Sequence, residues 1–315
     1  MTTPRISTVL TGCLLLALSG AANATIFGIK SCGSASPNEC FGGEVLGGGS
    51  MPPANLYSFE SDGSGFQDLG AITVNNNEVD ADGLAMKSDF VLFAFELEES
   101  ISTSGSTTTS TVTSSRLITL GTGSSNATVV GSVTLDREIR GAVFDGNDNL
   151  WAIDAMNDQL LQVSTSTGAE VGSAIDLMLS GSSFDLSTAS DIAIRADGTV
   201  VLSDADTFYN LDLGTGELTS SFSNSGTGNA GLAFNPESSN QLFAYEVNGF
   251  DDIYTYDTSL VSPTGSVEIS NIINSYNAGR GDLASRTIFS VPEPASVALM
   301  GLGLAGLGFA RRKRT

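Results

Sequence analysis

The chain has 315 residues and no histidine. Without an imidazole it cannot build a Ser-His-Asp triad, a Cys-His nucleophile pair or a histidine metal site. Carboxylates can still act in pairs as acid and base, but among thirty-five acidic residues no pair stands out. The sequence therefore favours a protein that is not an enzyme. The alternative is a hydrolase or lyase that uses carboxylates and a bound Ca²⁺.

Cysteine is nearly as scarce, with three residues. Cys13 lies in an apolar N-terminal stretch, which leaves Cys32 and Cys40 as a pair in a segment rich in Gly, Ser and Pro. In an exported protein such a pair predicts a small disulfide loop. We therefore expect residues 25–54 to form a glycine-rich segment closed by this disulfide.

Basic residues are also few, thirteen against thirty-five acidic ones. Five of the thirteen lie near the two ends, so the chain between Thr25 and Val291 holds eight basic and thirty-four acidic residues, a net charge of about −26. Such a surface repels nucleic acid and anionic lipid, whose binding needs a basic patch. It favours solubility in a salty medium, and the alternative use of so many carboxylates is to bind divalent cations.

Charged residues of both signs make up only 15% of the chain, whereas glycine is abundant at 36 residues. Helices usually carry more Glu, Lys and Arg than this. Hydrophobic residues reach 41%, which is enough for a sizeable core. The composition therefore predicts a turn-rich β protein rather than a helical or disordered one.

The first 24 residues have the three parts of a secretory signal helix. Arg5 supplies the positive start, residues 13–18 the centre of the apolar run, and Ala22 and Ala24 the small residues that precede cleavage. Export by the Sec translocon and cleavage by signal peptidase are expected. A lipobox that ends at Cys13 is the disfavoured alternative, because the apolar run lies mostly after that residue.

The last 25 residues combine three features in order. Val291-Pro292-Glu293-Pro294 resists regular structure because of its prolines, so it forms an extended and accessible peptide. Residues 295–310 are uncharged and rich in glycine, which predicts a short transmembrane helix. The basic tail Arg311-Arg312-Lys313-Arg314 stays cytoplasmic by the positive-inside rule, and this leaves the domain outside.

This order of motif, glycine-rich apolar helix and Arg-rich terminus resembles the PEP-CTERM family of sorting signals, over residues 291–315. The resemblance implies a Gram-negative bacterium with an exosortase, a membrane protease that acts near the motif. It also implies a setting of exopolysaccharide or biofilm production. We therefore expect a protein held in the inner membrane by its C-terminal helix, then placed at the cell surface or in the extracellular matrix.

A motif of small and apolar residues recurs along the chain at intervals of 58, 50, 40 and 51 residues. A Ser/Thr-rich insertion at Ser102–Ser115 accounts for the longest interval, which is 44 residues without it. We expect this insertion to form a solvated loop. The copies of the motif are Gly83-Leu84-Ala85-Met86, Gly141-Ala142-Val143-Phe144, Asp191-Ile192-Ala193-Ile194, Gly231-Leu232-Ala233-Phe234 and Asp282-Leu283-Ala284.

Further β-rich runs and turns follow each motif, and four short strands in about 45 residues are typical of a β-propeller blade. The chain begins with third and fourth strands at residues 56–74 and ends with first and second ones at residues 282–291. The two ends would complete one blade and leave no open sheet edge. We therefore predict an all-β propeller of about five four-stranded blades over residues 55–291, with a β-sandwich as the alternative. Thr25–Lys30 is an alternative second strand for the closing blade.

Asp145, Asn147 and Asn149 copy the spacing of the oxygen ligands in a calcium loop. Leu150 stands where such a loop has its turn-making glycine, and no Glu follows at the twelfth position. A plain hairpin turn is therefore favoured, and Ca²⁺ is the one candidate cofactor. Residues 80–83 show a similar but weaker pattern.

These features predict an exported, non-enzymatic surface or matrix protein whose propeller presents loops to polysaccharide, cation or another protein. Extracellular polysaccharide is one candidate partner, and the sequence does not identify the ligand. The rival enzyme predicts a cluster of acidic side chains that point into the central channel.

Overall fold

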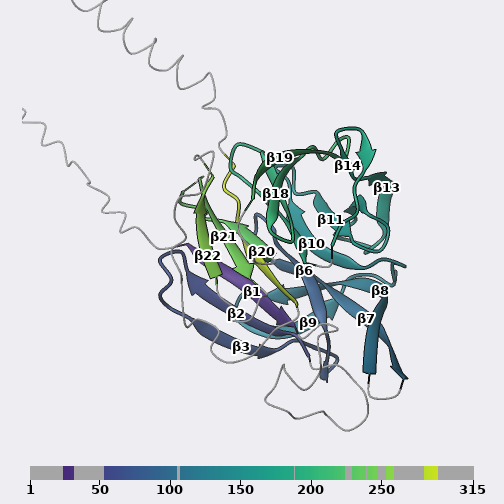
Figure 1. Cartoon of the computed structure of the whole chain (residues 1–315). Coiled ribbons are helices and arrows are strands. Elements are labelled where there is room, and N and C mark those ends of the chain that lie inside the picture. The colour runs from purple at the N-terminus through teal and green to yellow at the C-terminus, as the bar shows by residue number, and fades with distance from the viewer. Residues whose placement is uncertain are drawn as a thin grey trace, which may run out of the picture.

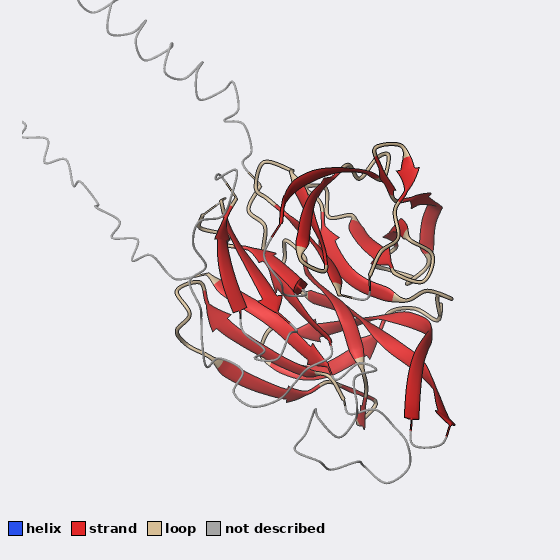
Figure 2. Cartoon of the chain, viewed as in Figure 1, coloured by secondary structure: helices blue, strands red, loops and turns tan. Residues whose placement is uncertain are grey.

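The structure is a computed structural model, and it describes residues 24–31, 53–104, 107–187, 189–223, 229–238, 240–246, 253–258 and 280–289. The described residues form strands, turns and loops, with no helix among them (Figure 2). Five sheets are arranged around a common centre as the blades of a β-propeller (Figure 1). This confirms the predicted fold and excludes the β-sandwich.

The innermost strand of every blade contains one copy of the repeated motif. Each of these strands contacts the next one around the centre, and the last returns to the first, so the ring is closed. Glycine and alanine let the backbones approach one another at this crowded position. The closing blade, whose innermost strand is β23 (Arg280–Ser285), is counted as the first. In ring order the innermost strands of the second to fifth blades are β6 (Ala81–Met86), β10 (Ile139–Phe144), β16 (Ser190–Ile194) and β20 (Asn229–Phe234).

Outside this ring the strands follow one another in antiparallel order, as expected for propeller blades. The second to fourth strands are β7 (Leu92–Ser104), β8 (Thr107–Gly121) and β9 (Ser124–Val129); β11 (Leu150–Asp154), β12 (Gln159–Val163) and β13 (Glu170–Asp176); β17 (Val200–Asp204), β18 (Thr207–Leu211) and β19 (Glu217–Ser223); and β21 (Gln241–Glu246) with β22 (Ile253–Asp257). Short strands β4 (Thr73–Val74) and β5 (Asn77–Glu78) extend the sheet of β9, and β14 (Met178–Leu179) and β15 (Ser182–Ser183) extend that of β19.

The closing blade combines both ends of the chain. Its strand order is β23, β1 (Thr25–Ser31), β2 (Asn55–Glu60) and β3 (Gln67–Ala71), and in Figure 1 the purple β1 lies beside β2. Ile29 of β1 pairs with Asp282 on one side and Leu56 on the other. The N-terminal strand, rather than residues 287–291, therefore supplies the second strand of this blade.

Residues 286–289 leave the blade and run across the end of the central channel. The Thr287 hydroxyl donates a hydrogen bond to the Ile194 carbonyl in the fourth blade (3.2 Å). Phe289 packs at Gly146 of the third blade, where its ring would lie 3.4 Å from an added Cβ. The chain thus crosses from β23 of the closing blade to the third and fourth blades before residue 290.

Five clusters of buried apolar side chains hold the blades together, one in each interface between neighbouring blades. Between the closing blade and the second blade, for example, Ile29 and Leu56 pack with Leu84 and Leu92, all fully buried. The central channel itself is lined by apolar motif residues and holds a cavity of about 20 Å³. That space accepts a water molecule but no larger ligand.

The Ser/Thr-rich insertion differs from its prediction. Its described residues are not a loop but the outer part of a long hairpin, in which β7 pairs with β8 out to Ser104 and Thr107. Threonine is β-branched and prefers extended backbone, so a Thr-rich run continues the strands on either side of it.

Candidate functional site

Two aspartates occupy a position that glycine holds in the other three blades. Asp191 begins the motif in β16 and Asp282 begins it in β23, and both are fully buried at the centre of the propeller. Burial of a carboxyl group is costly unless hydrogen bonds replace its water. The partners of these two side chains therefore define what this site does.

Each of the two carboxyl groups links its own blade to the next one. Asp191 accepts hydrogen bonds from the backbone N–H of the following residue (2.6 Å) and from that of Leu232 in β20. Asp282 accepts them from the following residue (2.6 Å) and from Leu84 in β6. The inner edge of an innermost strand has no neighbouring strand, so its N–H groups need such acceptors.

Glycine in the neighbouring blade makes room for each aspartate. A Cβ on Gly141 would lie 2.2 Å from Oδ1 of Asp191 and 2.7 Å from its Cα. A Cβ on Gly231 would lie 2.8 Å from the Cα of Asp282. The pattern of glycine and aspartate at this motif position is therefore a steric requirement of the closed ring.

A third carboxyl group and one cation complete the centre. Arg140 in β10 is only 2% exposed and donates from Nη1 to Oδ2 of Asp82 in β6 (3.3 Å). Its other terminal nitrogen contacts Glu138. The guanidinium thus compensates the charge of Asp82, as a buried ion requires. Asp82, Asp191 and Asp282 together are called the acidic cluster. All three are buried, and none of them is among the residues that line the central cavity, so the acids that the rival enzyme hypothesis expects to point into the channel stay a prediction.

Burial raises the pKa of both Asp191 and Asp282 well above the ordinary aspartate value. For Asp282 the nearby charge of Asp191, its hydrogen bond with Asp191 and the charge of Asp82 raise the pKa further. Two carboxyl groups in contact cannot both ionise without strong repulsion, so they share a proton. Through its hydrogen bonds to Leu232 and Leu84 the pair links neighbouring blades, and its raised pKa favours the protonated form.

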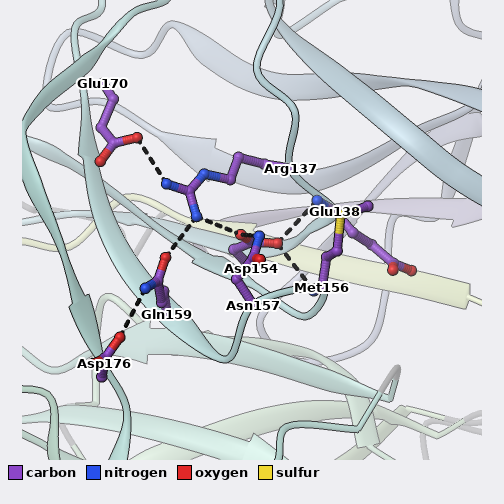
Figure 3. A network of polar contacts seen from close by, with 8 residues as sticks. All are labelled: Arg137, Glu138, Asp154, Met156, Asn157, Gln159, Glu170 and Asp176. Carbon is purple, nitrogen blue, oxygen red and sulfur yellow. Dashed lines mark hydrogen bonds and ion pairs between the residues drawn. The ribbon is translucent and has the colours of Figure 1, made fainter.

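A second polar network supports the third blade at the same end of the channel (Figure 3). Asp154 is fully buried at the end of β11, and every polar contact of its carboxylate fixes the loop that enters β10 or the turn that leaves β11. Arg137 joins Asp154 (2.9 Å) to Gln159 (2.6 Å) and Glu170 (3.1 Å). Asp154 also accepts from the backbone of Glu138 (3.0 Å) and Met156 (3.0 Å) and from Asn157 (2.7 Å), and Gln159 donates to Asp176 (2.7 Å).

The candidate calcium residues lie in the tight turn between β10 and β11. Asp145 accepts hydrogen bonds from the backbone of Asn147 (2.8 Å), from the backbone and side chain of Asn149 (2.9 Å each) and from the Trp151 indole (3.1 Å). Burial raises the pKa of Asp145, but these hydrogen bonds outweigh it and leave the pKa below its usual value. The turn accounts for the carboxylate as it stands, and calcium binding at Asp145, Asn147 and Asn149 stays a prediction.

Most other predicted site residues fall outside the described part of the chain. Ala24 is described and accepts a hydrogen bond from the Ser61 backbone (2.8 Å). Within the described ranges no helix is long and apolar enough to cross a membrane, and no three His, Cys, Asp or Glu residues are grouped to hold a metal ion. Outside these ranges lie Ala22, Cys32, Cys40, Val291, Pro292, Glu293, Pro294, Arg311, Arg312, Lys313 and Arg314.

A cavity of about 550 Å³ opens on the propeller face where the turns between first and second strands lie. Ala24 and Ile288 both line it, so the two ends of the domain leave it at one place. Phe90 and Arg286 face one another there, with the guanidinium carbon 4.5 Å from the ring centre.

Residues 290–314 match the PEP-CTERM protein-sorting motif. The chain carries a PEP-CTERM sorting signal. The match confirms the resemblance drawn from the sequence, and it implies export and membrane anchoring through an exosortase-type system. The matched residues begin directly after Phe289, the last described residue of the propeller.

No curated protein matches the chain. Among solved structures, a gluconolactonase from Xanthomonas campestris is 12% identical, with a TM-score of 0.42, over 60% of this chain and 61% of its own, so the match spans less than two thirds of that enzyme. A virginiamycin B lyase from Staphylococcus aureus is 12% identical, with a TM-score of 0.38, over 80% of this chain and 76% of its own. A chain of a nidogen/laminin complex is 10% identical, with a TM-score of 0.44, over 84% of this chain and 99% of its own.

Two of these three structures are enzymes, which contradicts the expectation that the chain is not an enzyme. That expectation was wrong because the missing histidine excludes imidazole chemistry and leaves carboxylate chemistry open. At these identities and scores the likenesses assign no activity to this chain.

The sequence contained a signal for the acidic cluster that motif searching missed. Asp191 and Asp282 stand at a repeat position where the other copies have glycine, and such a substitution within one repeat marks a side chain with a special partner. Arg140 stands directly before Gly141, the first residue of its motif copy. Spacing within any known metal or catalytic motif could not reveal them, because they come from separate blades.

The raised pKa of the Asp191–Asp282 pair predicts that stability falls as pH rises. The folded state keeps a proton that the unfolded chain releases near pH 4, so the stabilisation is complete below about pH 4 and is lost as pH rises through the folded pKa. Asp282→Asn keeps the acceptor for Leu84 and adds a donor to Asp191. We expect its melting temperature at pH 7 to exceed that of wild type by about 2–4 °C or more, with a flatter pH dependence.

Calorimetry from pH 4 to pH 8 measures this effect. The control is Asp206→Asn, which removes one negative charge from an exposed turn. Because that charge is only a minor cause of the raised pKa of Asp204, its removal should change the pH dependence of melting much less than Asp282→Asn does. If Asp282→Asn keeps the wild-type slope, the pair does not hold a proton.

Proposed function

We propose that the protein is exported, sorted by an exosortase-type system to the cell surface, and binds extracellular polysaccharide there through its propeller. The observation that carries this proposal is the sorting motif at residues 290–314, which begins directly after Phe289, the last described residue of the domain. A domain with this motif is delivered to the outside of the inner membrane, where its ligands are extracellular.

The charge of the domain supports a role for the sorting tail. A net charge of about −26 between Thr25 and Val291 repels the anionic surface of a membrane. The domain therefore needs its own peptide segments to be held near the bilayer. The two ends of the propeller meet at one cavity, so an N-terminal signal and the C-terminal tail would hold the same face toward the membrane until they are cut.

Replacement of Pro292, Glu293 and Pro294 by alanine tests the sorting step. The three substitutions remove the extended peptide that the protease is expected to read but keep the apolar segment. We expect the unprocessed chain to accumulate in the inner membrane, with at least a tenfold loss from the surface fraction, as measured by fractionation and mass spectrometry.

The matched control is Asp206→Asn, an exposed change in the propeller that should be sorted like wild type. Normal processing and surface delivery of the triple variant would contradict the proposed sorting.

The acidic cluster supports a second candidate function, a carboxylate-dependent hydrolase or lyase. Asp191 and Asp282 have the raised pKa values typical of a general acid. Against this, the cavity beside them is only about 20 Å³. Substrate would have to enter from the opposite end of the channel.

This candidate is tested by measuring turnover of lactones, glycans and phosphoesters by the wild-type protein. The same assays are repeated with Asp191→Asn and with a calcium chelator, both of which should inhibit an enzyme of this kind. The enzyme hypothesis predicts turnover that Asp191→Asn reduces at least a hundredfold while the variant stays folded. No turnover, or turnover that survives the substitution, would eliminate the acidic cluster as an active site.

A further inference from the structure

The turn between β6 and β7 contains a residue that its backbone disfavours. Corresponding turns of the third and fourth blades place Asp148 (φ 60°) and Gly198 (φ 89°) in the left-handed region. The second blade places Phe90 there, with φ 67°. Each of the three donates its N–H to the residue three positions earlier, at 2.9–3.0 Å, so the turns are equivalent. Asp and Gly suit this conformation, and a bulky aromatic residue does not.

Burial of the Phe90 side chain does not offset the conformational strain of its backbone, because Phe90 is 55% exposed. Its one described ring contact is with Arg286, whose guanidinium carbon lies 4.5 Å from the ring centre. A residue whose backbone is held in a disfavoured conformation while its aromatic ring faces solvent indicates a role in binding.

Arg286 is a cation without an anionic partner among the described residues. In the part of the chain that the structure describes, no ion pair involves Arg286, and its Nε is buried without a hydrogen-bond partner. This is unusual in a domain with thirty-four acidic and eight basic residues. A guanidinium that contacts an aromatic ring keeps its N–H donors for a further partner, and their fork matches the two oxygens of a carboxylate.

Both side chains line the cavity of about 550 Å³, a volume within the range of small-ligand sites. Its wall combines apolar and hydrogen-bonding groups. Phe27 and Ile288 add apolar surface next to Phe90. Polar groups that can accept or donate to hydroxyls come from separate parts of the chain, namely Thr25, Ser58, Glu60, Gln67, Thr122 and Glu237.

We propose that this cavity binds a saccharide that carries a carboxylate, such as a uronic acid residue of an acidic polysaccharide. The carboxylate pairs with Arg286, the C–H face of the sugar ring lies on Phe90, and its hydroxyls donate to Glu60 and Glu237. This inference rests on the proposed function and names the ligand class of the same protein. A neutral glycan would leave Arg286 unpaired, and the acidic wall disfavours a polyanion without hydroxyl groups.

Isothermal titration of protein purified from the exporting cells tests the proposal. The probes are an oligogalacturonate, its methyl ester and a neutral maltooligosaccharide of the same length. We expect the oligogalacturonate to bind at least tenfold tighter than the ester, because the ester cannot form the charged pair with Arg286. Equal binding of acid and ester, or no binding of the acid, would overturn the proposal.

Three variants locate the site. Arg286→Gln should weaken oligogalacturonate binding at least tenfold and leave binding of the ester unchanged. Phe90→Asn should weaken both probes without lowering the melting temperature, since Asn tolerates the left-handed backbone. Arg195→Gln, in the equivalent turn of the fourth blade and paired with Asp197, is the control and should bind like wild type.

If Arg286→Gln binds the acid as tightly as wild type does, the cavity is not the site. Fractionation of the same variants separates this inference from the proposed function. Arg286→Gln should be sorted normally even though it binds poorly. Correct sorting without acid binding removes the ligand assignment alone, and acid binding without surface delivery removes the sorting proposal alone.

Discussion

The fold depends on how five innermost strands satisfy backbone groups that face a central channel whose cavity is only about 20 Å³. A sheet edge normally pairs with another strand or with solvent. Here two aspartate carboxyl groups accept N–H groups of the neighbouring blades instead. The same two side chains therefore stabilise individual strands and fix how adjacent blades are spaced.

Other features follow from this arrangement. Neighbouring motif positions must be glycine, because a Cβ would collide with the aspartates. Both carboxyl groups have a raised pKa, because they are buried and the charges of neighbouring carboxyl groups disfavour their ionisation. Asp282 belongs to β23, so its hydrogen bond with Leu84 forms only when β23 is in place. β23 is in turn held in the closing blade by β1, which pairs with β23 on one side and β2 on the other. Closure of the ring thus involves the residues next to both ends of the domain.

The repeat spacing was sufficient to predict the propeller and its five blades, because each motif copy builds one innermost strand. It also offered Thr25–Lys30 as a closing strand, since that run is apolar and lies at the right end. Backbone pairing decided between this strand and residues 287–291. The long β7–β8 hairpin was missed because a Ser/Thr-rich run has the composition of a loop, although threonine favours strands.

The sites were less predictable than the fold. Asp191 and Asp282 belong to no known motif, and their importance lies in contacts between blades that are far apart in the sequence. The cavity is built in the same way, because Phe90 and Arg286 are 196 positions apart and meet only when the ring closes. Conversely, the residues with calcium-like spacing at Asp145 lie within one turn and hydrogen-bond to one another, and calcium binding there stays a prediction.

The most direct test of the central constraint is hydrogen exchange at the backbone amides of Leu84 and Leu232. If the carboxyl bridges hold the ring, both amides exchange among the slowest in the protein. In Asp282→Ala the amide of Leu84 then exchanges at least tenfold faster, while that of Leu232 keeps its protection through Asp191. Rapid exchange of both amides in wild type, or no change at Leu84 in the variant, would contradict this account of how the propeller is closed.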